Sequence, residues 1–243
     1  MLRTLFAVPA IIADTLVHAG PIIGASFVSV PAADPLIRSW ARVVLLASGV
    51  TLTVDGLEHL DLSQRYIFVA NHQSHMDVPS IVAALPLTVR FVAKQSLFKI
   101  PVFGQAIRAV GTIEIDRSNR EDALKKMQEA QTGVARQASI LFFAEGTRSE
   151  DCQLKPFKKG AFAMAAALGL PIVPIGVSGT NAVLPPGLHP IRGGPVRVRI
   201  GTPFAVGENT PEERRRLQRR AEEEVAKLLG VAPPSSGGDP DRP

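Results

Sequence analysis

Cysteine, tryptophan and tyrosine are nearly absent from this sequence, with one residue of each among 243. The single cysteine, Cys152, excludes an internal disulfide and a metal cluster built from cysteines. So few aromatic side chains argue against a protein that binds nucleic acid by stacking its bases. The sequence also lacks a Walker-type loop, a Gly-x-Gly-x-x-Gly motif and internal repeats. The phosphate-binding loops and repeat folds that those patterns mark are therefore not expected.

Charge is scarce at the start of the chain. Between Thr4 and Ala33 the only charged residue is Asp14, and the 19 residues from Thr15 to Ala33 carry none. A run of about 20 apolar residues can cross a bilayer core. This one is a mediocre span because four residues interrupt it: Gly20, Pro21, Gly24 and Pro31. We expect residues 1–33 to form a membrane-associating segment; soluble packing and a cleaved signal peptide are the alternatives.

Basic residues outnumber acidic ones, which gives a net charge of +5 and a sequence pI near 9.7. That balance favours anionic partners such as a phospholipid surface or a phosphorylated substrate. The length and the 46% apolar content suit one good-sized hydrophobic core. We therefore expect a single folded domain with appendages, at residues 34–230. Residues 231–243, rich in Pro, Ser, Gly and Asp, are expected to be disordered.

Apolar runs, alternation and capping signals place strands and helices in turn along the chain. Strands are predicted at 51–54, 66–70, 89–93, 111–117, 139–144, 172–177 and 196–200. Helices are predicted at 35–48, 77–85, 118–137, 160–168 and 210–230. This order predicts an α/β fold with a mixed, largely parallel sheet flanked by helices.

His72 and Asp77 follow the buried run at 66–70. Histidine is the side chain most easily poised as a base near neutral pH, and a carboxylate can fix its tautomer. Five residues along a regular helix lie about 140° from the same face, so the pair can meet only in a turn that enters a helix. A surface histidine beside a capping aspartate is the alternative from spacing alone. His75 has no further clustered ligands, so we expect no metal site.

Cations and a polar block stand at the ends of other predicted strands. Lys94 ends one strand, Arg117 ends another, and a third leads into 145–148, which contains Arg148. In an α/β sheet, ligands bind beyond the carboxyl ends of the strands, and arginine binds phosphate with two hydrogen bonds. These residues predict a phosphate site beside a proton-transfer site, although each cation alone is more often a solvated charge.

Four blocks in order resemble the glycerolipid acyltransferases, and most of all the bacterial 1-acyl-glycerol-3-phosphate acyltransferases. They are Asn71-His72-x-x-x-x-Asp77, then residues 111–117, then 143–149, then 172–175. The resemblance covers roughly residues 40 to 205. Two positions depart from the family pattern. Ala144 stands where proline is usual, which lowers the rigidity of the turn, and Glu114 stands where an aromatic or apolar residue is common.

The resemblance implies a function and a role for each site residue. His72 is the general base on the free hydroxyl of lysophosphatidic acid, and Asp77 orients it. The hydroxyl attacks the thioester of acyl-CoA or acyl-carrier protein, and phosphatidic acid is formed without a further cofactor. The acceptor's phosphate is held by Lys94, Arg117, Glu145, Gly146, Thr147 and Arg148.

The family also implies location and partners: a membrane, at the cytoplasmic face of the bacterial inner membrane, and no nucleic acid. Two alternatives remain. One is acylation of another lysolipid, such as a lyso-ornithine lipid, which would leave the cations without a phosphate. The other is a non-catalytic lipid-binding or scaffold protein, against which the intact His72 and Asp77 count.

Overall fold

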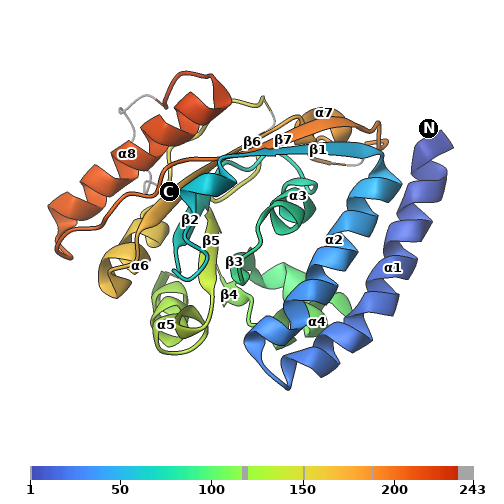
Figure 1. The fold of residues 1–243 in the computed structure, drawn as a ribbon, viewed down its shortest axis with the longest axis horizontal. Coiled ribbons are helices and arrows are strands. Elements are labelled where there is room, and N and C mark those ends of the chain that lie inside the picture. Colours follow the sequence, from blue (N-terminus) through green and yellow to red (C-terminus); the bar gives the residue numbers. More distant parts are fainter. Residues whose placement is uncertain (1, 117–119, 150, 188, 235–243) are drawn as a thin grey trace.

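The computed structural model describes residues 2–116, 120–149, 151–187 and 189–234. Helices and strands alternate through most of this part of the chain (Figure 1). The helices are α1 (Leu2–Ser26), α2 (Asp34–Ser48), α3 (Asp77–Ala84), α4 (Phe103–Ala109), α5 (Arg120–Thr132), α6 (Gly160–Leu168), α7 (Thr180–Val183) and α8 (Pro211–Leu229). The strands are β1 (Val50–Asp55), β2 (Ile67–Ala70), β3 (Val89–Lys94), β4 (Ile113–Ile115), β5 (Ser139–Phe143), β6 (Ile172–Ser178) and β7 (Gly194–Ile200).

The described strands form one sheet of seven in the order β1-β7-β6-β2-β5-β3-β4. From β6 to β4 every pair of neighbours is parallel. β7 runs antiparallel to β6, and β1 runs parallel to β7. The predicted mixed, largely parallel sheet is therefore confirmed. The carboxyl ends of β6, β2, β5, β3 and β4 lie at the same edge, so the segments that follow these strands meet there.

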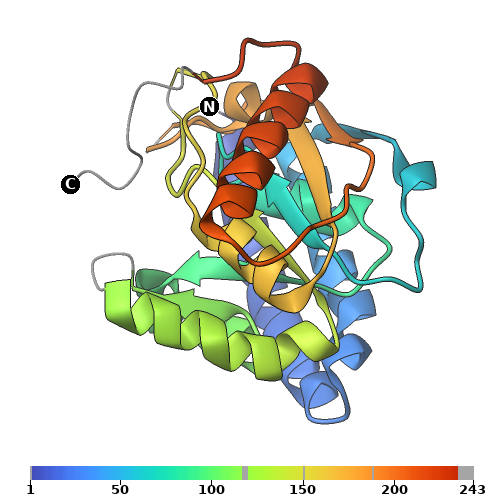
Figure 2. The same cartoon turned by 90° about the vertical axis from the view of Figure 1, so that its left-hand side faces the viewer.

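β2 lies at the centre of the sheet and all four of its side chains are fully buried. Because successive strand residues point to opposite faces, Ile67 and Val69 join a core with α6 and α8, whereas Phe68 and Ala70 join a core with α2 and α3. Figures 1 and 2 show α5, α6 and α8 on one side of the sheet and α2, α3 and α4 on the other. This burial on both faces explains why β2 reads as a continuous apolar run.

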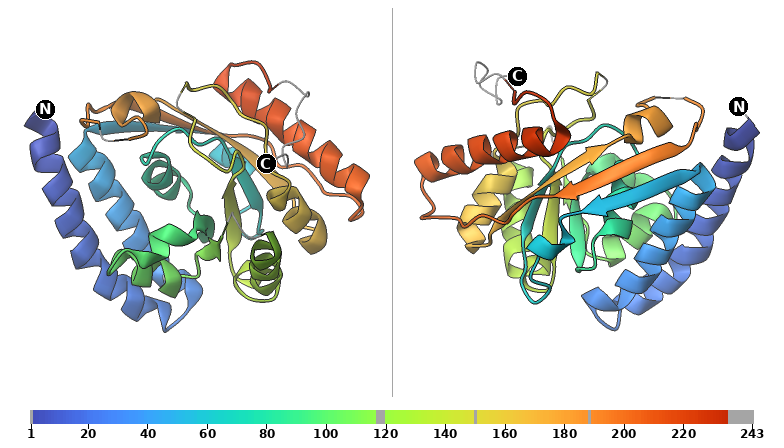
Figure 3. Two further views of the ribbon diagram at one scale, coloured as in Figure 1. Left: turned by 180° about the vertical axis from the view of Figure 1, so that it is seen from behind. Right: turned by 45° about the horizontal axis from the view of Figure 1, so that its top comes forward.

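α1 packs beside α2 at one end of the molecule, far from α8 (Figure 3). It is long and apolar enough to cross a membrane, and only 17% of its most apolar window is buried. Ala7, Ala19 and Ile22 face the protein, whereas Phe6 and Val17 are about 70% exposed. This exposed apolar surface supports the predicted membrane association of the segment.

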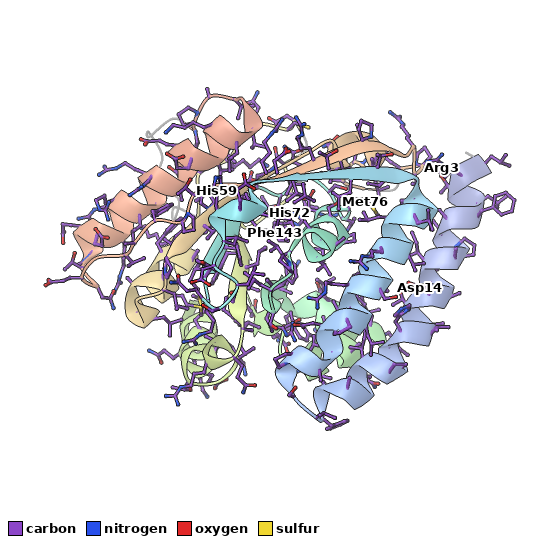
Figure 4. All side chains as sticks on the ribbon, in the orientation of Figure 1. Arg3, Asp14, His59, His72, Met76 and Phe143 are labelled. Carbon is purple, nitrogen blue, oxygen red and sulfur yellow. The ribbon has the colours of Figure 1, made fainter. Side chains whose placement is uncertain are left out.

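Polar contacts attach α1 to the rest of the protein. Arg3 donates to the carbonyl oxygens of Ser48 and Gly49, at 3.2 and 3.3 Å, where α2 ends (Figure 4). Further along, the Trp40 indole donates to Thr15 Oγ1 at 3.0 Å. Trp40 of α2 therefore faces α1.

Two of the predicted segments have different ends in the structure. The apolar segment expected at residues 1–33 forms a helix from Leu2 to Ser26 and a separate short helical turn at Val30–Ala33. Pro9 and Pro21 lie inside the long helix, and packing against α2 offsets the destabilisation that internal prolines cause. The helix predicted to reach Gln137 ends at Thr132, because Gly133 leaves the helical region at φ −103°, ψ −105°. The first residue of that predicted helix, Ser118, lies outside the described residues, as do 235–243 of the predicted tail.

The last helix begins and ends as predicted, with Thr210 as its cap and Gly230 in the left-handed conformation after it. Thr210 and Glu213 have the spacing of a capping box, but only half of it forms. Thr210 Oγ1 accepts the Glu213 N–H at 3.2 Å, but the Glu213 carboxylate accepts the Gly207 N–H instead of returning to Thr210.

Candidate active site

His72 and Asp77 meet at the carboxyl edge of the sheet, where the chain leaves β2 and enters α3. His72 Nδ1 lies 2.7 Å from Asp77 Oδ2. The same oxygen accepts the backbone N–H groups of Gln73 and Ser74 at 2.7 and 2.9 Å, and Asp77 is fully buried. An oxygen that accepts this many hydrogen bonds acts as a carboxylate, so Nδ1 of His72 carries the proton. Nε2 is left with a lone pair, as a general base requires.

Hydrogen bonds to β6 and to the segment after α7 hold this turn. The Asn71 side chain donates to the Val177 carbonyl at 2.9 Å and accepts the Val177 N–H at 2.8 Å. This exchange continues the β2–β6 pairing one residue beyond the strand. The Ser74 hydroxyl donates to the Leu184 carbonyl at 2.6 Å. The turn between strand and helix is thus fixed at both ends, as the spacing of His72 and Asp77 required.

Phe143 stacks on the His72 ring, with centroids 3.9 Å apart and planes inclined by 17° (Figure 4). Phe91 of β3 lies behind Phe143, at 6.1 Å between centroids. We did not predict either contact. Phe143 pairs with Ala70 in the register of β5 and β2, so it stands next to His72 only because the two strands are neighbours. This contact depends on the order of the strands in the sheet, which the sequence does not reveal.

The loop after β5 holds the backbone of His72 on both sides. The His72 N–H donates to Glu145 Oε1 at 2.6 Å, and the His72 carbonyl accepts the Ser149 N–H at 2.8 Å. Glu145 Oε2 accepts the Lys155 N–H at 3.1 Å. Burial leaves Glu145 only 3% exposed and raises its pKa to about 7. Both carboxylate oxygens of Glu145, which the sequence predicts at the phosphate site, are thus engaged by backbone N–H groups.

The other residues of the predicted block at 145–148 are partly or fully exposed to solvent. Gly146 adopts φ +74°, a left-handed conformation that favours glycine, and Thr147 is exposed. Arg148 donates through Nη1 to His75 Nε2. Burial, and then the charge of Arg148, hold the pKa of His75 below its usual range. A neutral His75 can accept this hydrogen bond. His75, three residues after His72 in the sequence, thus orients the guanidinium of Arg148.

Of the two remaining predicted cations, only Lys94 lies within the described residues. Lys94 is exposed at the carboxyl end of β3, at the same edge as His72. Arg117, predicted to follow β4, lies outside the described residues. Within the described residues, no three His, Cys, Asp or Glu side chains form a group that could hold a metal ion.

An apolar cavity of about 100 Å³ lies between α1, α2, α3, β3 and α4. Its lining includes Ala19, Ile22, Phe91, Ala106, Ile107 and Val110. Through Phe91 and Phe143 its wall is in ring contact with His72. An aliphatic chain is the kind of group that such a lining binds.

The fold and the site define a class: an α/β protein with a His–Asp pair at the carboxyl edge of its sheet, beside an apolar cavity. The chain belongs to the Acyltransferase family, whose model matches residues 51–178, just over half of its length. The family resemblance inferred from the sequence is thus confirmed.

Relatives support a narrower placement. A chloroplastic 1-acyl-sn-glycerol-3-phosphate acyltransferase of Brassica napus is 38% identical over 69% of this chain and 48% of its own. A Saccharomyces cerevisiae enzyme of that name is 34% identical over 72% of this chain and 59% of its own. The chain thus spans about half the length of the curated relatives it matches.

A solved structure covers nearly the whole chain. It is the 1-acyl-sn-glycerophosphate acyltransferase of Thermotoga maritima, with a TM-score of 0.78 and 27% identity. The similarity covers 93% of this chain and 95% of that one. The likeness therefore extends well beyond residues 51–178, which the family model matches.

Proposed function

We propose that this protein is an O-acyltransferase that moves a fatty acyl group to the free hydroxyl of lysophosphatidic acid and so makes phosphatidic acid. The observation that carries the proposal is the His72 Nδ1 to Asp77 Oδ2 contact at 2.7 Å at the sheet edge. The names of the relatives support this acceptor, because those from Brassica napus and Saccharomyces cerevisiae are 1-acyl-sn-glycerol-3-phosphate acyltransferases. The donor is acyl-CoA or acyl-carrier protein.

The geometry suits a direct transfer. His72 Nε2 removes the proton of the acceptor hydroxyl as its oxygen attacks the thioester carbonyl. Asp77 stabilises the imidazolium that forms, since its carboxylate already accepts the Nδ1–H. The carbon–sulfur bond then breaks, and the thiol leaves with the proton from His72. The thioester is the only activated group in this scheme, so we propose that no cofactor takes part.

The acceptor's phosphate is proposed to bind at the open side of the same edge. Arg148, held by His75, is the best placed guanidinium. Lys94 supplies a second charge at the end of β3, and Arg117, Gly146 and Thr147 complete the set carried over from the family blocks. Two cations beside a base would bring the phosphate and the hydroxyl of one small molecule together.

The apolar cavity is proposed to take the acyl chain of the donor. Its lining is almost wholly apolar, and α1, the helix with the exposed apolar surface, forms part of its wall. A chain delivered from a lipid surface would thus reach the cavity without crossing water. We propose that the protein works at a membrane, on the cytoplasmic face of the bacterial inner membrane, where phosphorylated substrates and anionic lipids favour its positive charge.

Acyl transfer by the purified protein in detergent tests the proposal. Lysophosphatidic acid is supplied with acyl-CoA and, separately, with acyl-carrier protein. We expect phosphatidic acid from the wild type, and a loss of at least about a thousandfold in kcat in His72→Ala. His189→Ala, a change of an exposed histidine, should keep full activity. A wild type that forms no product with either donor, or a His72→Ala variant with full activity, would overturn the proposal.

A further inference from the structure

The ring of His72 is well fixed, but its position depends on its backbone. His72 belongs to neither β2 nor α3, so no ladder or helix satisfies its N–H and carbonyl. Both groups are instead bound by the loop after β5: Glu145 accepts from the N–H and Ser149 donates to the carbonyl. A residue outside regular structure is placed only as firmly as such contacts hold it.

Only a carboxylate can fill the place of Glu145. Its two oxygens face two donors, the N–H groups of His72 and Lys155, at 2.6 and 3.1 Å. A glutamine has one oxygen and an NH₂ group, so it would point a donor at a donor. When Glu145 is ionised, its charge also strengthens both hydrogen bonds. An acid at this position is thus explained without any contact to a substrate.

We propose that Glu145 is a positioning residue for the transfer: its carboxylate holds the backbone of His72 so that Nε2 stays in line with the acceptor hydroxyl. Glu145 acts through His72 and does not touch the phosphate. The expected effect on kcat rests on the proposed function, whereas the expected effect on the backbone of His72 rests on the geometry alone.

Steady-state kinetics of Glu145→Gln separate positioning from substrate binding. A displaced base affects the transition state and not the bound ground state, so we expect kcat to fall about 10- to 100-fold while KM for lysophosphatidic acid changes less than about twofold. Glu145→Asp keeps the charge but withdraws the carboxylate by one methylene, and should lower kcat in the same way. A rise in KM at unchanged kcat in either variant would make Glu145 a substrate contact and overturn the proposal.

Glu222→Gln is the matched control. Glu222 of α8 is a partly buried carboxylate that, like Glu145, accepts a backbone N–H, that of Phe157, at 2.8 Å, and burial raises its pKa too. It has no contact with His72 among those found in the described residues. Its loss should lower the melting temperature comparably and leave kcat unchanged. An equal loss of kcat in this variant would show that general loosening, and not the hold on His72, explains the effect of Glu145.

Amide hydrogen exchange tests the same hold without any substrate. In the full chain in detergent, the His72 amide should exchange at least about tenfold faster in Glu145→Gln and Glu145→Asp than in the wild type, and no faster in Glu222→Gln. A wild type without acyltransferase activity would overturn the proposed function, but the exchange measurement would still test the positioning role of Glu145. Unchanged exchange at His72 in both Glu145 variants would overturn the positioning role.

Discussion

At the scale of single residues, the site depends on which groups accept hydrogen bonds. Asp77 Oδ2 accepts from two backbone amides and from His72 at once, so the carboxylate has one orientation and the imidazole one tautomer. Phe143 covers one ring face. A base held in this way loses little free energy to reorganisation when the reaction begins.

Asp77→Asn should therefore lower kcat by about a thousandfold or more. The amide of asparagine places a donor where three donors already point, which turns the imidazole to the wrong tautomer or breaks the turn. The measurement is acyl transfer beside a melting curve. A variant that melts like the wild type but keeps more than about a tenth of its kcat would contradict the assigned role.

Glu145 should also give a pH dependence to stability. Its pKa of about 7 in the folded protein exceeds the usual 4.5, so the folded state binds this proton more tightly than the unfolded chain. The resulting stabilisation is full below about pH 4.5 and is lost as the pH rises through about 7. We expect the free energy of unfolding to fall by about 2 kcal/mol more between pH 5 and pH 8 in the wild type than in Glu145→Gln. Equal falls in urea titrations would show that Glu145 has an ordinary pKa.

At the scale of helices and strands, one buried ion pair joins α2 to the sheet. Asp34, in the first turn of α2, lies 2.8 Å from Arg90 Nη1 of β3, and both side chains are less than 8% exposed. Thr88 also donates to Asp34. Because Arg90 lines the apolar cavity as well, this pair ties the N-terminal helices to the wall of the proposed acyl site.

Asp34→Asn should cost about 3 kcal/mol of stability, because it leaves the Arg90 charge buried beside a neutral amide. Glu212→Gln removes the partner of Arg215 in an exposed pair on α8 and should stay within about 0.5 kcal/mol of the wild type. Unfolding of the two variants by urea in detergent gives the comparison. A similar small loss in both would mean that the buried pair contributes no more than a surface one.

At the scale of the whole molecule, the cavity is formed by segments that lie far apart in the sequence. α1, α2, α3, β3 and α4 each supply part of its lining, and α1 is also the helix that carries the exposed apolar surface. If the acyl chain lies there, membrane association and substrate binding share one element. The N-terminal segment is then part of the site and not only an anchor.

Ala106→Leu tests this arrangement. Ala106 lines the cavity from α4 and is 8% exposed, so a larger side chain shortens the space for an acyl chain. We expect the preference for long over short acyl-CoA, as a ratio of kcat/KM values, to fall at least about tenfold. Gln105→Leu places the same side chain on the exposed side of the helix and should leave the ratio unchanged. An unaltered ratio in Ala106→Leu would exclude this cavity as the acyl site.

Local patterns were sufficient for much of the fold and for the central pair. The strand at 66–70, the turn at His72 and the helix that begins at Asp77 could all be predicted, because burial, turn and helix start depend on neighbours in the sequence. The ends of α1 and α5 could not, since packing against α2 offsets the cost of internal prolines and one glycine conformation ended a periodic helix.

The surroundings of His72 were decided by tertiary structure. Phe143 and Glu145 lie more than 70 positions away in the sequence, and they reach His72 because β5 pairs with β2 in a particular register. The same charged residue can face a phosphate or a backbone amide from the end of a strand. Which of these occurs depends on the direction of the loop and on burial, and for Glu145 both were set by contacts with the backbone of His72 and of Lys155.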